Sequence, residues 1–173
     1  MFWRGAALSI VAVCLSGCAS QRTGFDYAGV MQKVGPPRPG QTRIVVLEEK
    51  ASGLTATACD VKVDGGPMGQ LKPGTYVYAD RPAGRHQLWA SENLFPGETM
   101  RDIATESGRT YFFLARTSDR HNAVMRMTMA GGLAGMLVGS AVTSGSDNAG
   151  PIDFVPLDEA AARTTIAELQ LAE

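Results

Sequence analysis

The chain has 173 residues, of which 45% are hydrophobic and 19% are charged, and its formal net charge at pH 7 is −1. This near-neutral balance, without a polybasic or polyacidic run, argues against binding to nucleic acid. The length suits one domain with a real hydrophobic core but hardly two.

The N-terminus reads as an export signal. Arg4 precedes an apolar run over residues 6–13, and Leu-Ser-Gly-Cys follows at residues 15–18. The run is too short to span a bilayer, and its order is that of a secretory signal peptide. The tetrapeptide resembles the lipobox of bacterial lipoproteins, which implies cleavage after residues 1–17 and lipidation of Cys18.

This resemblance implies a location. We expect a protein of the bacterial cell envelope that meets the membrane through the lipid on Cys18, because several acyl chains make a durable anchor. Ala19 follows the cysteine where an inner-membrane retention signal would place aspartate, so we expect the outer membrane, on its periplasmic side.

The cysteine count leaves one thiol. Cys14 would leave with the signal peptide and Cys18 would take lipid, so Cys59 stands alone and no intramolecular disulfide is expected in the mature chain. Cys59 lies in the alternating stretch 58–63, where one face must be covered, and we predict that it is buried.

Residues 18–41 are predicted to form the lipidated N-terminus and a tether. Pro36, Pro37 and Pro39, flanked by Gly35 and Gly40, oppose regular structure and favour an extended chain.

Beyond the tether, short alternating runs separated by turn residues predict antiparallel β structure. Asp64-Gly65-Gly66 is a hairpin sequence, because both glycines accept a positive φ. The predicted strands are 42–49, 58–64, 75–79, 86–91, 100–106, 110–116 and, after a long gap, 152–155. Alternation points these side chains inward: Ile44, Val46, Val61, Val63, Leu88, Ala90, and Tyr111, Phe113 and Ala115 or their neighbours.

The chain end is predicted to be a helix over 157–171, with Ile166, Leu169 and Ala162 facing the sheet at helical spacing. Together these features predict an α+β, mainly β fold for residues 42–173. The expected architecture is a small antiparallel β-sandwich-like domain with a Gly-rich apolar insertion over residues 127–146 and a C-terminal helix.

The chain carries a set of short motifs in a fixed order, in segments 42–46, 63–71, 73–76, 82–86 and 108–113. Together these segments resemble domain-of-unknown-function family 2846, a group of bacterial lipoproteins with a small β domain. The resemblance covers roughly residues 38–118, and also the tail from Phe154. The same order of Val-x-Asp-Gly, Gly-x-Leu and Pro-x-Gly-x-His is similar to PEGA-type surface modules. Neither resemblance implies an activity, and the recurring residues read as turn and core chemistry.

No catalytic or metal-binding constellation is visible. His86 and His121 lie in different segments, no Cys–His spacing suits zinc, and no serine has a nucleophile setting. Asp64 opens a tight turn, where its carboxylate can accept backbone N–H bonds. We expect no catalytic residue, no metal ligand and no cofactor, and the protein is not predicted to be an enzyme. Trp89, Tyr76 and Tyr78 suit either a binding surface or strand packing.

One segment departs from the family pattern. Residues 127–146 carry no charge, and Gly131, Gly135 and Gly139 recur at every fourth position. On a helix these glycines would form one smooth helix-packing face, as in a glycine zipper. The alternatives are a helix that self-associates or touches lipid, and a flexible or surface-packed insertion between strands.

These observations lead to two functional hypotheses. The first is a membrane-anchored envelope lipoprotein that acts as a non-catalytic binding or structural module for an envelope protein or glycan. The second is a membrane-associated assembly component that forms homo-oligomers through the 127–146 glycine zipper.

Overall fold

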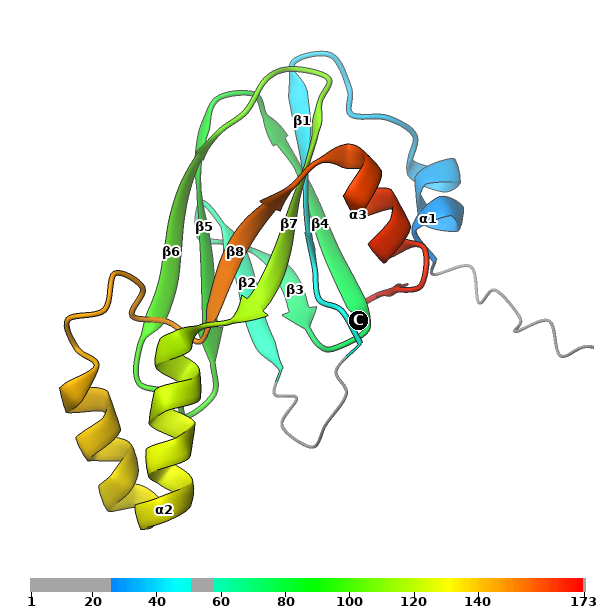
Figure 1. Ribbon diagram of the computed structural model, residues 1–173. Coiled ribbons are helices and arrows are strands. Elements are labelled where there is room, and N and C mark those ends of the chain that lie inside the picture. Colours follow the sequence, from blue (N-terminus) through cyan, green and yellow to red (C-terminus); the bar gives the residue numbers. More distant parts are fainter. Residues whose placement is uncertain (1–25, 51–57, 173) are drawn as a thin grey trace, which may run out of the picture.

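The computed structural model describes residues 26–50 and 58–172, and Cys18 lies outside these ranges. The described residues form two packed sheets (Figure 1). One contains β1 (Gln41–Leu47), β4 (Thr75–Pro82), β7 (Thr110–Thr117), β8 (Ile152–Leu157) and β9 (Gln170–Leu171) in the order β8-β7-β1-β4-β9. The other contains β2 (Cys59–Val63), β3 (Gly66–Leu71), β5 (Arg85–Glu92) and β6 (Glu98–Ala104) in the order β3-β2-β5-β6. The fold class is therefore α+β and mostly strand.

The five-stranded sheet is mixed, so the expectation of purely antiparallel pairing was wrong for it. β1 pairs parallel with β7, and β9 pairs parallel with β4. Before β7 the chain forms β5 and β6 of the other sheet. It then re-enters the five-stranded sheet with β7 running in the same direction as β1. β3 was not predicted as a strand because Gly66, Pro67 and Gly69 suggest a turn. It lies at a sheet edge, where proline and glycine are tolerated.

The predicted inner faces are confirmed. One cluster fills the space between the sheets, and it includes Ile44, Val46, Val61, Val63, Leu88, Ala90, Phe113 and Ala115, with Tyr111 partly buried against it. A second cluster lies on the other face of the five-stranded sheet, where Val45 and Leu47 pack with side chains of the helices. β1 is thus buried on both faces, while the outer face of the four-stranded sheet stays open.

Helix α1 (Tyr27–Val34) lies within the range predicted to be a tether, so that prediction was wrong for these eight residues. Asp26 caps the helix by accepting a hydrogen bond from the backbone N–H of Gly29, and Gly35 ends it with φ 73°. Val30 is buried in the second cluster. The prolines that suggested a tether all lie beyond the helix, where they prevent its continuation.

Helix α3 (Glu159–Ile166) is shorter than the predicted 157–171. Asp158 caps it, and after Ile166 the chain turns so that β9 pairs with β4, which satisfies its backbone groups with a sheet partner. The predicted inward face is confirmed, because Ala162, Ile166 and Leu169 are all buried in the second cluster.

Helix α2 (Asp119–Val142) contains most of the charge-free segment, which is therefore helical as far as Val142. Gly132 interrupts it with φ 59° and ψ −140°, a backbone conformation that only glycine adopts readily. Figure 1 shows the result, two antiparallel arms that project together from the β domain. Among the described residues, no helix is both long and apolar enough to cross a membrane.

Two of the three glycines of the predicted packing face lie inside this hairpin. A Cβ atom on Gly135 would overlap the Met127 carbonyl, and one on Gly139 would lie 3.2 Å from Val124 Cα and from the Met127 side chain. Gly131 has no such neighbour within 4 Å. Gly135 and Gly139 therefore let the two arms of one chain approach closely, and the face they form is already covered.

Candidate functional site

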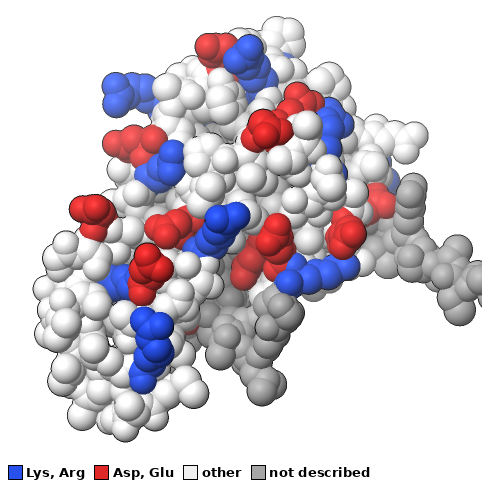
Figure 2. Space-filling view, in the orientation of Figure 1, with Lys and Arg blue, Asp and Glu red and all other residues white. Residues whose placement is uncertain are grey.

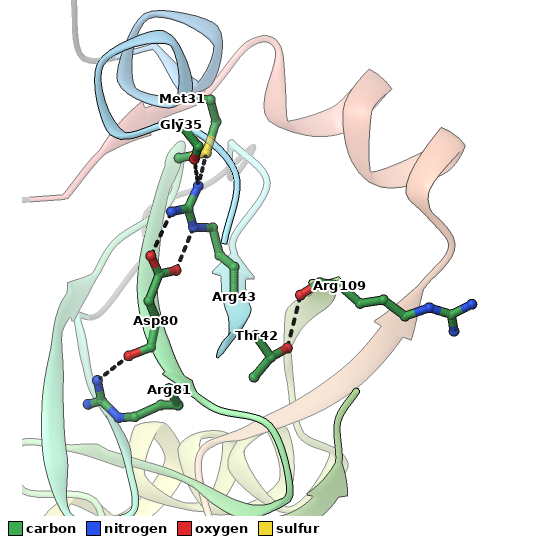
Figure 3. Close-up of polar contacts among 7 residues, drawn as sticks. All are labelled: Met31, Gly35, Thr42, Arg43, Asp80, Arg81 and Arg109. Atoms are coloured by element: carbon green, nitrogen blue, oxygen red, sulfur yellow. Dashed lines mark hydrogen bonds and ion pairs between the residues drawn. The ribbon is translucent and has the colours of Figure 1, made fainter. Parts of the chain in front are cut away.

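Arg43 is a buried cation at the centre of the five-stranded sheet. Its Nε and Nη2 donate to the two carboxylate oxygens of Asp80 at 2.6 and 2.7 Å. These residues are register partners on β1 and β4. Nη1 donates to the Gly35 carbonyl at 2.7 Å and lies 2.8 Å from Met31 Sδ (Figure 3). The hydrogen bonds that Arg43 donates to Asp80 raise the Arg43 pKa, although burial opposes this shift. Through Nη1, Arg43 also ties α1 to the sheet.

A groove of about 700 Å³ opens above this ion pair, between α1 and α3. We call it the α1–α3 groove. Its lining comes from four elements, α1, β1, β7 and α3, and from the short segments that adjoin them. The lining residues are Tyr27, Ala28, Met31, Gly35, Pro36, Pro37, Arg43, Gly108, Arg109, Thr110, Tyr111, Glu159, Arg163, Ile166 and Ala167. It combines apolar side chains and tyrosine rings with the buried Arg43 at its floor and exposed charges at its rim.

The groove's rim carries two exposed arginines. Arg163 donates to Glu159 at 2.6 and 2.9 Å across one helical turn, and Arg109 lies 3.2 Å from Glu106. The Arg109 carbonyl accepts a hydrogen bond from the Thr42 hydroxyl, while its guanidinium points away from the Arg43 cluster (Figure 3). Both arginines are thus held by surface ion pairs that water screens, and a bound anionic group can compete for them.

Residues 38–129 match the family described as protein of unknown function (DUF2846), which is more than half of the chain. The chain belongs to the DUF2846 family. The match contains the Arg43–Asp80 pair and Arg109, whereas α1 and α3 lie outside it. The groove therefore joins the DUF2846 domain to two flanking helices. No curated protein is significantly similar to the chain.

His86 and Asp64 form a turn clamp. His86 Nδ1 lies 2.6 Å from Asp64 Oδ2, and its Nε2 lies 2.8 Å from the Pro82 carbonyl oxygen. Burial raises the Asp64 pKa, but hydrogen bonds from the Gln87 backbone and from His86 together lower it by more. The net shift of the Asp64 pKa is therefore downward. Both residues therefore join the β2–β3 turn to β5, as hydrogen-bonded turn and strand residues.

The remaining sequence candidates are packed into the fold. Cys59 is buried as predicted, and burial together with nearby carboxylates raises its thiol pKa to about 12. Tyr76 is fully buried, and the Tyr78 ring lies 5.2 Å from the Arg43 guanidinium. Trp89 lies on the open face of the four-stranded sheet, where Lys62 Nζ covers its ring at 4.1 Å.

A group of ionisable side chains lies at the end of the sandwich nearest α2. Cys59 and Glu92 are register partners on β2 and β5, and Glu92 lies 3.0 Å from His121 Nε2, an ion-pair distance without hydrogen-bond geometry. Phe95 stacks on the His121 ring at 5.0 Å. In the described part of the chain, no three His, Cys, Asp or Glu side chains are arranged to hold a metal ion.

Glu48 lies at the same end of the sandwich, and its raised pKa predicts that the stability of the fold depends on pH. Burial, with a smaller contribution from Glu92, raises its pKa from 4.5 to about 7. The folded state then keeps a proton that the unfolded chain releases above pH 4.5, so rising pH favours unfolding. We expect the urea midpoint to fall between about pH 5 and pH 7.5. Glu48→Gln should remove most of this fall, and an unchanged slope in the variant would contradict the assignment.

Sequence reasoning missed the groove. A visible signal existed for its floor, since Arg43 and Asp80 are opposite charges within two apolar runs that pair as strands. Tyr27, Glu159 and Arg163 had no such signal, because only the folded chain brings α1 and α3 to the same face of the sheet.

Proposed function

We propose that the protein is a bacterial envelope lipoprotein whose β domain is a non-catalytic binding module for an envelope protein or glycan. The lipobox-like sequence at residues 15–18 supports the anchor through lipid on Cys18, at the periplasmic side of the outer membrane.

The observation that carries the binding role is the α1–α3 groove. Its volume of about 700 Å³ is in the range of ligand sites, and it offers the ring of Tyr27 beside exposed guanidinium groups. Tyrosine and arginine are enriched where proteins bind partners, because each joins a large contact surface to hydrogen bonding. An extended polypeptide segment or a glycan strand with anionic groups fits this lining.

The groove's most buried ion pair serves structure. Arg43 uses Nε, Nη1 and Nη2 on Asp80, Gly35 and Met31, so its hydrogen-bonding capacity is largely satisfied within the domain. This leaves the rim residues Arg109 and Arg163 to contact a ligand. Recognition by a rigid floor and a charged rim is what a binding module needs.

Site-specific photocrosslinking tests the proposal. A photoreactive residue at Ala28, an exposed groove position, should capture an envelope protein or peptidoglycan in intact cells. Gln87, exposed on the four-stranded sheet, is the matched control and should capture much less. Arg109→Glu with Arg163→Glu should weaken capture at Ala28. Equal capture at both positions would refute the groove as the binding site.

A further inference from the structure

The α2 hairpin presents an apolar surface that the fold does not use. Among the described residues, eight large hydrophobic side chains are exposed, and five of them lie on this hairpin. They are Met129 (82% exposed), Leu133 (71%), Leu137 (64%), Val138 (56%) and Val142 (69%). Soluble domains rarely gather exposed apolar side chains in one place unless the surface meets a partner or a membrane.

The hairpin contacts the β domain only at its base. Its buried residues are Arg120, His121 and Val124 in the first two turns, and Gly139 against the opposite arm. Arg120 fixes this base, since its Nη1 donates to the carbonyls of Pro96 and Ala149. The tip at Gly131 and Gly132 is exposed, and a Cβ atom added to either glycine would have no neighbour within 4 Å outside the adjoining helix backbone. The apolar surface is therefore presented outward, away from the β domain (Figure 1).

The charged residues of the hairpin lie toward its base and leave its tip uncharged. No charged residue lies between Arg126 and Asp147, and Arg126 is exposed about one turn and a half from the tip. Figure 2 shows this lobe as uncharged toward its tip and bordered by charged residues. A cation at that level would meet lipid phosphates when the tip enters the boundary between headgroups and acyl chains.

The bend at Gly132 decides how deep such a contact can go. An unbroken helix of 20 residues would reach about 30 Å, enough to cross the hydrocarbon core. The two arms of the hairpin, residues 119–131 and 133–142, are shorter and reach roughly 20 and 15 Å. The backbone groups at the turn also need hydrogen-bond partners, which the hydrocarbon core lacks. A shallow contact of roughly 5–10 Å with one leaflet satisfies both limits.

We propose that the apolar tip of the α2 hairpin docks on a lipid bilayer, with Met129, Leu133 and Leu137 in one leaflet. The bilayer is near because residues 18–25 reach at most about 28 Å from the lipid on Cys18 to the start of the described structure. In this one respect the inference rests on the proposed function. It is a second, reversible contact that would orient the groove relative to the membrane.

Vesicle flotation tests the inference without the lipid anchor. The probe is vesicles of phosphatidylethanolamine and phosphatidylglycerol, and the protein is the full mature chain with Cys18→Ser. We expect it to float with the vesicles, and Leu133→Glu with Leu137→Glu to lower the bound-to-free ratio roughly tenfold or more. Met100→Glu is the matched control, because Met100 is 60% exposed but lies on β6. It should bind as the unchanged chain does.

A spectroscopic readout locates the contact. Leu133→Trp should show a blue-shifted emission with vesicles, and Met100→Trp should not. Three outcomes would overturn the inference. The Cys18→Ser chain could fail to float with the vesicles, or Met100→Glu could lower binding as much as the Leu133→Glu and Leu137→Glu pair does. The third outcome is a dimer in buffer that this pair of changes abolishes, in a chain that does not float. The last would assign the surface to a second copy. None of these outcomes depends on whether Cys18 carries lipid, so this test and that of the anchor fail separately.

Discussion

Asp80→Ala is expected to lower the free energy of unfolding by about 3 kcal/mol, since it leaves the buried Arg43 without its counter-ion. Arg43 is 1% exposed, and a guanidinium keeps its proton even in a buried site, so Arg43 cannot escape the cost by becoming neutral. The Asp80 side chain keeps 27% exposure, so water can partly replace the lost carboxylate and the effect lies at the lower end of the range for buried pairs. Urea unfolding monitored by circular dichroism measures it.

Two further variants separate the ion pair from general damage. Arg163→Ala removes an exposed ion pair with Glu159 and should cost at most about 0.5 kcal/mol. Arg43→Met combined with Asp80→Leu replaces the buried pair by apolar side chains and should recover most of the loss. If Asp80→Ala proved as mild as Arg163→Ala, the fold would not depend on the buried Arg43–Asp80 pair.

The interior of the sandwich could be predicted from the sequence because apolar and polar side chains alternate along each strand. Ile44 and Val46 face the other sheet, and the period of two places them there without knowledge of the topology. Val45 and Leu47 were beyond this reasoning, since their burial depends on α1 and α3. The same holds for the groove, whose walls come from distant parts of the chain.

Two local patterns gave an incomplete picture for physical reasons. Residues 27–34 form a helix of eight residues, a length that is marginal in isolation and depends on packing at Val30 and on the Asp26 cap. In the charge-free segment, the repeat of glycines suggested an intermolecular face. The neighbouring pair Gly131 and Gly132 was the better signal, because only the second adopts the backbone conformation that folds the helix back.

If the protein is anchored as proposed, Cys18→Ser is expected to move it from the membrane fraction to the soluble fraction of the envelope, because this change removes the site of the proposed lipid. The comparison must use an unrelated cleavable signal with Cys18→Ser, because the protein's own signal would stay uncleaved and would itself hold the chain at the membrane. Each buried methylene of an acyl chain contributes about 0.8 kcal/mol, far more in total than a few side chains of a hairpin tip. Cys14→Ser, with the protein's own signal retained, is the matched control and should remain in the membrane fraction.

The same fractionation distinguishes the anchor from the hairpin contact. If lipid is the principal anchor, a wash in buffer releases the Cys18→Ser protein from the membrane. Any fraction of this protein that stays bound is then released when Leu133→Glu and Leu137→Glu are added. If the Cys18→Ser protein resists washing until those two side chains are changed, the hairpin holds the membrane by itself and the lipid is secondary. If both variants remain bound, neither feature is the anchor, and the envelope partner of the α1–α3 groove becomes the candidate that retains the protein.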